Sequence, residues 1–594
     1  MRSFRILFAC FLLLVGSNLF AQVPSKKPVK QCNAQLARQI VEQQADFSKT
    51  LGETDQRVNV LIRVADFLWI SDEESARRYF AEAFQVAQDR FREKGFEKKE
   101  NKGLTTIQPD YRFNVISAVA KRDAEWAKKL SDAVLKEFDE DTEKDKRSDY
   151  DKTREVQELL SIAAKMANEN PGLALSLARR AMRYPLNNSW YFSLYEMAGN
   201  NQLLADRVYA EALENYSNAE VFRLLYLSAY PFGKERIFGI ERYSLGSSVP
   251  ADFSPNPNLQ RQFLLTLLRR VTKLTPESTD KSLQTQTPES AVAVIAMNEI
   301  EPLVAQQFPD LMPAFSQAKI LANSVVSNEL LDSANKRDEM GKNFGKSFAE
   351  KLKELEKADA DGNLKDSQII QLVTSARKEE DYKSAETWLN KITEESARES
   401  AKNYYYFQRS KLASKENRLD DAKKYAEKID KIELRAVLYF DIAAAKQKNS
   451  ATRLESLESL SEVYKMTQKA PDSIEKAQVL LGLAFMYEKV DHFNALDALS
   501  NAIKTANKLE NPNLFTSSMS QQIISKGHMF FTSYDVPGFD VNKTFYEISQ
   551  KDFQSAILQA ESFTDKYLRT LAVLASVKDC EKNEPPVKLK AKTK

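Results

Sequence analysis

Histidine, cysteine, glycine and proline are scarce in this chain of 594 residues, and the shortages exclude several classes of protein. Only His492 and His528 are present, so no metal site with three imidazole ligands can form within one chain. Beyond residue 21 the only cysteines are Cys32 and Cys580, which excludes a scaffold stapled by many disulfides. The 15 glycines and 19 prolines are few for this length, which favours helix and disfavours an all-β fold.

Positive and negative charges nearly cancel, with 86 Lys and Arg residues against 84 Asp and Glu. Such a balance gives no general attraction to nucleic acid, so nucleic acid is not predicted as a partner. The catalytic or cofactor-binding patterns GxSxG, HExxH, CxxC and GxGxxG are all missing. We therefore predict no catalytic residue, no cofactor and no metal ion, although Tyr, Arg or Glu side chains remain able to do chemistry.

Two segments come close to ligand-binding motifs. Gly341–Ser347 resembles a phosphate-binding loop but has one residue too few between its glycines. Lys357–Gln368 resembles a calcium-binding loop, with Asp359, Asp361 and Gly362 at suitable positions. Its first and last residues lack the carboxylates that a hard cation requires there. We therefore interpret both segments as junctions between helices.

The N-terminus has the features of a secretory signal peptide. Arg2 and Arg5 supply the positive charge, and Ile6–Val15 is an apolar stretch of about ten residues. Leu19-Phe20-Ala21 offers a cleavage site, so residues 1–21 are predicted to be removed and the protein to be exported, to the periplasm or the cell exterior. No later stretch approaches the ~20 apolar residues of a membrane-spanning helix, so none is predicted after signal cleavage.

Three distant parts of the chain share one spacing of alanines. In each, a second alanine follows the first after eleven residues, and a third follows after seven more. Small residues at such intervals allow two antiparallel helices to approach closely and to stack on a neighbouring pair. The spacing therefore predicts helical hairpins around three sets of alanines: Ala65, Ala76 and Ala83; Ala163, Ala174 and Ala181; Ala484, Ala495 and Ala502.

One hairpin, Lys476–Asn507, resembles the tetratricopeptide-type repeat. That motif has large, large, small and aromatic residues in its first helix and small, large and small residues in its second. The chain places Leu480, Leu483, Ala484, Tyr487, Ala495, Leu499 and Ala502 at these positions. The resemblance covers about half the chain in divergent form, because the turn is one residue shorter and the 34-residue period is not kept. It implies an all-α fold, an α-solenoid or superhelical array of antiparallel hairpins, and a habit of binding partners. The alternative is a general helical bundle whose alanines are merely helix formers.

Breaks in the helical pattern suggest an organisation into two halves. The longest break, 230–258, contains many Pro and Gly residues. The break at 272–290, which is predicted to be a linker, is rich in Thr, Ser and Gln. Two shorter segments, 93–110 and 527–541, are predicted to be irregular. The predicted regions are a helical-repeat region 22–271 with an irregular loop at 230–258, a linker 272–290, a second helical-repeat region 291–580 and a disordered basic tail 581–594.

Aromatic residues gather in the long loop, and they suggest a binding site. Tyr230, Phe232, Phe238 and Tyr243 crowd within 14 residues, where exposed rings would be able to grip a peptide or stack on a sugar. Packing between repeats is nevertheless the favoured role for these rings, and a binding site is the other role that the sequence leaves open. The favoured function is an exported, non-enzymatic scaffold that binds a protein or peptide. The alternatives are an envelope protein that binds glycans and a helical-toroid enzyme that acts on envelope polymers.

Cys32 and Cys580 form a disulfide only if the two ends of the chain meet. Stacked hairpins usually carry the ends of a repeat array apart, whereas a disulfide needs Cα atoms within about 7 Å. Free or intermolecular thiols are therefore predicted ahead of a Cys32–Cys580 bridge, which would require a closed superhelix.

Overall fold

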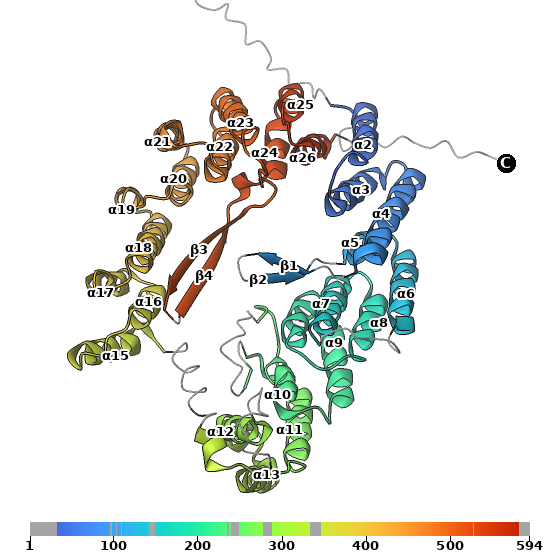
Figure 1. The fold of residues 1–594 in the computed structure, drawn as a ribbon, viewed down its shortest axis with the longest axis vertical. Helices are drawn as coiled ribbons and strands as arrows, with labels where there is room; N and C mark the ends of the chain where they lie inside the picture. Colours follow the sequence, from blue (N-terminus) through green and yellow to red (C-terminus); the bar gives the residue numbers. More distant parts are fainter. Residues whose placement is uncertain are drawn as a thin grey trace, which may run out of the picture. The chain divides into compact units, whose positions relative to one another are not determined.

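The computed structural model describes residues 32–95, 98–101, 104–107, 110–141, 149–234, 237–238, 249–276, 288–332, 335, 346–526 and 528–580. The predicted segments 1–21, 341–345 and 581–594 lie outside these residues. Antiparallel helical hairpins make up most of the described chain, which confirms the all-α repeat fold (Figure 1). Within this part of the chain, no helix combines the length and apolarity needed to span a membrane.

The chain divides into two compact units. The first unit comprises Met1–Asp46, Ala413–Ser520 and Ser533–Lys594, and the second comprises Phe47–Leu412 and Gln521–Thr532. The helices before and after 272–290 belong to the same unit, and residues 277–287 lie outside the described residues, so the role of this segment as a linker stays a prediction.

The second unit begins with a continuous run of helical hairpins. A short two-stranded sheet, β1 (Lys98–Asn101) and β2 (Leu104–Ile107), lies in the segment predicted to be irregular, and it pairs Lys98 with Ile107 in antiparallel register. The helices are α3 (Thr54–Leu68), α4 (Glu73–Lys94), α5 (Tyr111–Ala120), α6 (Ala124–Asp141), α7 (Asp149–Met166), α8 (Pro171–Ala181), α9 (Ser189–Asn215), α10 (Val221–Leu224), η2 (Leu225–Leu227), η3 (Tyr230–Phe232), α11 (Pro257–Val271), α12 (Glu289–Gln307), η5 (Pro309–Leu311), α13 (Met312–Val325), α15 (Phe348–Ala360), α16 (Asp366–Ser375), α17 (Glu379–Leu389) and most of α18 (Glu395–Lys415).

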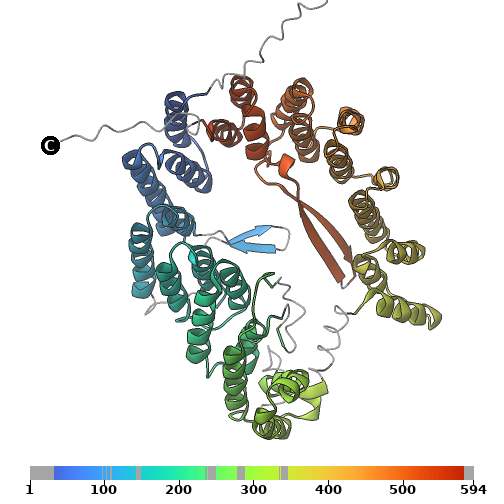
Figure 2. The ribbon, with the colours of Figure 1, turned by 180° about the vertical axis from the view of Figure 1, so that it is seen from behind.

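The first unit combines α2 (Ala34–Ser48), whose last two residues fall in the second unit, with the C-terminal hairpins. Its other helices are α19 (Leu419–Ala426), α20 (Ile432–Gln447), η6 (Arg453–Glu455), α21 (Ser456–Lys469), α22 (Ile474–Tyr487), α23 (His492–Ala506), η7 (Pro537–Phe539), α24 (Val541–Ser549), α25 (Phe553–Glu561) and α26 (Lys566–Val577). A hairpin of two strands, β3 (Ser518–Ser525) and β4 (His528–Asp535), leads from α23 to α24 (Figure 2).

A common local sequence starts the second helix of several hairpins. An Asp or Asn caps the helix, and an alanine four residues later is fully buried. In the α3–α4 hairpin, for example, Asp72 accepts the backbone N–H of Ser75 at 3.1 Å, and the buried alanine is Ala76. This pattern occurs at Asp72 and Ala76, Asp123 and Ala127, Asn170 and Ala174, Asn201 and Ala205, Asp491 and Ala495, and Asp552 and Ala556.

The three sets of alanines with the shared eleven- and seven-residue spacing lie where helices pack closely. All nine alanines of the three sets are 0 % exposed, so their prediction as sites of close helix packing is confirmed. Asn201 repeats the cap inside α9, where its non-helical backbone (φ −158°, ψ 93°) divides one long element into two helices. A methyl side chain at each crossing lets the two helix backbones approach, whereas a larger one would separate them.

Candidate binding surface on the β3–β4 hairpin

The aromatic residues predicted as a binding site lie in the core. Tyr230, Phe232 and Phe238 are 1 %, 8 % and 6 % exposed, so these three rings do not form the exposed cluster that binding would require, and the favoured packing role fits them. Their rings pack against one another and against neighbouring helices, as when Phe232 meets Phe238 edge to face at 5.7 Å between centroids. Tyr243 lies outside the described residues.

Tyr230 shows why these rings are buried. Its ring stacks on Tyr209 at 5.2 Å and contacts Phe253 at the same distance. Its hydroxyl donates to Asp206 Oδ1 at 2.7 Å, which satisfies the polar tip of an otherwise apolar side chain. Burial, together with this hydrogen bond, raises the pKa of Tyr230 well above its ordinary range. The favoured packing role therefore describes the three rings.

The two cysteines are joined in the structure. Cys32 and Cys580 form a disulfide within the first unit, with their Cα atoms 5.5 Å apart. This differs from the expectation of free or intermolecular thiols, because α2 packs in the same unit as the C-terminal helices. Periodicity along the sequence describes contacts between neighbouring hairpins and does not show that the two ends meet.

Part of the segment 527–541, which was predicted to be irregular, forms strand β4 of the β3–β4 hairpin. Two residues separate the strands, so they must run antiparallel, and this places Ile523 opposite Phe530. Burial alternates strictly along β3, which gives the hairpin one covered face and one open face. The hairpin was missed because helical periodicity dominates the sequence on both sides of it. The alternation in Ser518–Ser525 and the short Lys-Gly connection were the available signals.

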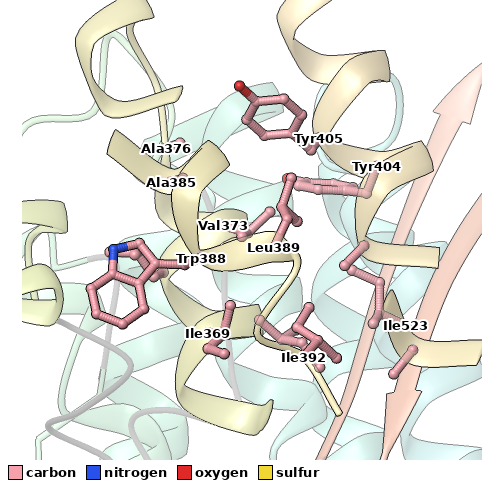
Figure 3. Packing of buried hydrophobic residues seen from close by; sticks show 14 of the residues in the cluster. Ile369, Val373, Ala376, Ala385, Trp388, Leu389, Ile392, Tyr404, Tyr405 and Ile523 are labelled. Carbon is pink, nitrogen blue, oxygen red and sulfur yellow. The ribbon is translucent and has the colours of Figure 1, made fainter. Parts of the chain in front are cut away.

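The covered face anchors the hairpin to helices of the second unit. Ile523 is fully buried in a core cluster formed with residues of α16, α17 and α18 (Figure 3). Phe530 packs on the same cluster and meets the ring of Tyr404 edge to face, with the centroids 5.0 Å apart. Tyr404 and Tyr405 are themselves buried there, so the aromatic run Tyr404–Phe407 serves packing at this point. Apolar contacts of Ile523 and Phe530 therefore hold this part of the hairpin against α16, α17 and α18.

The open face carries three large apolar side chains. Ile524, Met529 and Phe531 are 53 %, 69 % and 60 % exposed, and we call these three residues the hairpin apolar face. Antiparallel pairing sets Ile524 opposite Met529, and Phe531 follows two residues later on the same side. Single exposed apolar residues are common on protein surfaces, but three neighbours on one strand pair form a patch.

The strand edges beside this patch lack the usual protection. Among the described residues, β3 and β4 form a sheet of two strands, so each strand has one edge that faces away from the other strand. Soluble proteins commonly place charged residues on such edges to prevent pairing with other chains. β3 contains no charged residue, and β4 contains only Asp535 besides His528. The arrangement suits the addition of an extended segment from another protein.

A cluster of ionisable side chains joins the turns of two successive hairpins in the first unit. His492 Nδ1 lies 2.8 Å from Glu488 Oε2, and His492 Nε2 lies 3.7 Å from Asp552 Oδ2. Lys551 Nζ lies 2.9 Å from Glu488 Oε1. Burial opposes the ionisation of Asp552, but hydrogen bonds from Ser555 and the nearby His492 hold its pKa below the ordinary value. These contacts neutralise the buried Glu488 and link the hairpins.

A fully buried arginine has a comparable structural setting in the second unit. The Arg112 guanidinium donates to both oxygens of Asp110, to Gln88 and to Glu137, and it lies 3.6 Å from the centroid of the Phe91 ring. Paired and hydrogen-bonded in this way, the buried charge is compensated. In the described part of the chain, no group of three His, Cys, Asp or Glu side chains is arranged to hold a metal ion.

Fold and surface together define a helical-repeat protein with one anchored, partly apolar β-hairpin. No protein-family model matches the chain, and no curated protein matches it. Among solved structures it is similar to a circular tandem repeat protein with novel repeat topology and enhanced subunit contact surfaces, at 14 % identity over 92 % of this chain and 96 % of that one. The TM-score of 0.10 is too low for this likeness to carry an argument.

Proposed function

We propose that this protein is an exported, non-enzymatic scaffold of divergent tetratricopeptide-like repeats that binds a protein partner through the β3–β4 hairpin. Helical repeats of this kind offer extended surfaces, and their insertions commonly carry the binding role. The observation that carries the proposal is the hairpin apolar face, which lies on an element anchored from its other side by Ile523 and Phe530.

The partner segment that fits this surface is extended and uncharged. The outer edge of a strand can recognise backbone N–H and C=O groups, so it favours a segment that adds as a further strand. Ile524, Met529 and Phe531 would contact alternate apolar side chains of that segment. A sugar needs polar groups around an aromatic platform, whereas Met529 and Ile524 extend the apolar surface on one side of the Phe531 ring. These features favour a peptide over a glycan.

Export is supported by two independent features. Residues 1–21 have the composition of a secretory signal peptide. The disulfide between Cys32 and Cys580 suits an oxidising compartment such as the periplasm or the cell exterior, because cytosolic thiols are kept reduced.

Site-specific photo-crosslinking tests the binding proposal. A benzophenone amino acid replaces Phe531 in one variant and Leu558 of α25 in a matched control variant, since Leu558 is 69 % exposed and lies outside the hairpin. In the native envelope, the proposal expects one defined crosslinked protein from position 531 that is missing from position 558. The crosslink should be lost when Ile524 and Met529 are both changed to Ser.

Two outcomes would contradict this proposal. Equal crosslinking from both positions would indicate general stickiness, and no crosslinked protein from position 531 would remove the hairpin as a protein-binding surface. A glycan array provides the separate test of the alternative, because binding that depends on Phe531 without any crosslinked protein would favour a glycan ligand.

A further inference from the structure

The disulfide joins the end of one helix to the beginning of another. Cys580 lies three residues after the end of α26, and Cys32 lies two residues before the start of α2. Both cysteines are buried, at 4 % and 8 % exposure. The bond therefore connects the C-terminal and N-terminal helices of the described chain inside the first unit.

This connection has the dimensions of an ordinary hairpin turn. In the α3–α4 hairpin the first helix ends at Leu68 and the second begins at Glu73. In the α22–α23 hairpin the corresponding residues are Tyr487 and His492. Between the end of α26 at Val577 and the start of α2 at Ala34, the path through the disulfide passes residues 578–580 and 32–33. This path is similar in length to the turns of those two hairpins. The disulfide thus takes the place of the peptide turn that connects the two helices elsewhere.

The side chains of α2 that are almost completely buried are mostly small. The residues of α2 that are almost completely buried are Ala37, Val41, Ala45 and Ser48, three of which have side chains of one carbon or a hydroxymethyl group. Apolar burial stabilises in proportion to area, so this face contributes little compared with a face of Leu or Phe. By contrast, α26 is buried at every residue but one from Tyr567 to Val577, which makes Cys580 a firm point of attachment.

We propose that the redox state of Cys32 and Cys580 controls whether α2 is docked in the first unit. With the disulfide formed, α2 stays beside the C-terminal helices. With both thiols reduced, the only remaining covalent link of α2 to the described helices runs through residues 49–53 to α3 of the second unit, and α2 leaves its site. The proposal is independent of the proposed function, because it concerns neither the hairpin apolar face nor a partner.

The chemistry requires a dithiol reductant. One thiolate of the reductant attacks a cysteine sulfur, forms a mixed disulfide and displaces the other cysteine as a thiolate. The second thiolate of the reductant then attacks the mixed disulfide, so two electrons pass to the chain and the reductant ends as a cyclic disulfide. Both cysteines finish as thiols. Because the cysteines are buried, reduction should be slow and limited by transient opening of α2.

Hydrogen–deuterium exchange of the full chain tests this proposal. The oxidised protein is compared with protein incubated in dithiothreitol, and complete reduction is verified by an intact-mass gain of two hydrogens. Amides of α2 should exchange at least about tenfold faster after reduction, while those of α22 and α23 keep their protection. The Cys32→Ser/Cys580→Ser variant should match the reduced protein without any reductant.

Unchanged exchange in α2 after complete reduction would overturn the proposal, since the small apolar face would then suffice for docking. An equal loss of protection in α22 and α23 would also overturn it, because the bond would then hold the whole unit together. If the double variant fails to fold, the comparison of oxidised and reduced wild-type protein still decides between these results.

Discussion

The ring of Phe530 in β4 meets the ring of Tyr404 in α18 edge to face, with centroids 5.0 Å apart and planes inclined at 75°. These residues are far apart in the sequence, yet their contact belongs to a core that also contains Ile523. The next residue along the strand, Phe531, points to the opposite side and is 60 % exposed. Two neighbouring phenylalanines therefore have different settings: one anchors the hairpin, and the other is exposed on the face where we propose that a partner binds.

Replacing these two phenylalanines one at a time by alanine should affect different properties: the Phe530 variant should lose stability, and the Phe531 variant should lose partner binding. Phe530→Ala removes a partly buried ring and its aromatic contact, so we expect a loss of about 1–3 kcal/mol in the free energy of unfolding. Phe531→Ala should change stability by no more than about 0.5 kcal/mol while abolishing the crosslink to a partner. Urea unfolding followed by circular dichroism measures both values. Equal destabilisation by the two variants would show that the assignment of faces is wrong.

The buried alanines should not tolerate a larger side chain. Ala76 and Ala81 lie on the same helix, α4, but Ala76 is fully buried at the α3 contact and Ala81 is exposed. Ala76→Leu should overpack the contact and cost about 1–3 kcal/mol, and the same cost is expected for Ala174→Leu and Ala495→Leu. Ala81→Leu, the matched control, should stay within about 0.5 kcal/mol because Leu is also a good helix former. If Ala76→Leu unfolds at the wild-type midpoint, close helix packing at this position is refuted.

The helical hairpins could be predicted because their signal is local. Ala76 and Ala495 show it well, since a cap residue and a small residue four positions later define both the helix start and its contact. The β3–β4 hairpin was harder to predict, because Ile523 is buried by residues more than a hundred positions away. Short apolar segments can form either helix or strand, and tertiary contacts decide between the two.

The candidate site could not be found from residue types alone. Tyr230 and Phe531 are both aromatic residues in segments that interrupt the helical pattern, yet one is buried and the other is exposed. The difference arises from partners such as Asp206 and Tyr209, which the fold brings to Tyr230. The pairing of Cys32 with Cys580 depends in the same way on where the two ends of the chain lie.

The disulfide makes a simple prediction for thiol counting. Denatured but unreduced monomer that lacks residues 1–21 should contain no reactive thiol, and after reduction it should contain those of Cys32 and Cys580. Because the bond closes a separation of 548 residues, the chain-entropy model gives an upper stabilisation of about 6 kcal/mol. Mass spectrometry after alkylation measures the count. Two alkylated cysteines in the unreduced monomer would show that the ends are not joined.

Acid should weaken the cap at Asp123 in a defined direction. This carboxylate accepts the backbone N–H of Trp126 at 2.9 Å and the guanidinium of Arg77 at 2.7 Å. The backbone hydrogen bond, followed by the one from Arg77, holds the pKa of Asp123 below its ordinary value of 3.8. A lowered pKa contributes stability that is fully present above the ordinary value and is lost as the pH falls through the lowered one. The cap should therefore be at full strength at neutral pH and should weaken as the pH falls below 3.8.

Asp123→Asn isolates the charge, because an asparagine still caps the helix but no longer pairs with Arg77. Since Arg77 is 40 % exposed, the wild type should exceed this variant by only about 0.2–1 kcal/mol at neutral pH, and the difference should shrink as Asp123 is protonated in acid. Urea midpoints at about pH 7 and about pH 2.5 provide the comparison. Asp310→Asn, which breaks an exposed pair with Arg261, is the control and should barely move either midpoint. A wild-type advantage that persists unchanged in acid would mean that the Asp123 charge contributes nothing to stability.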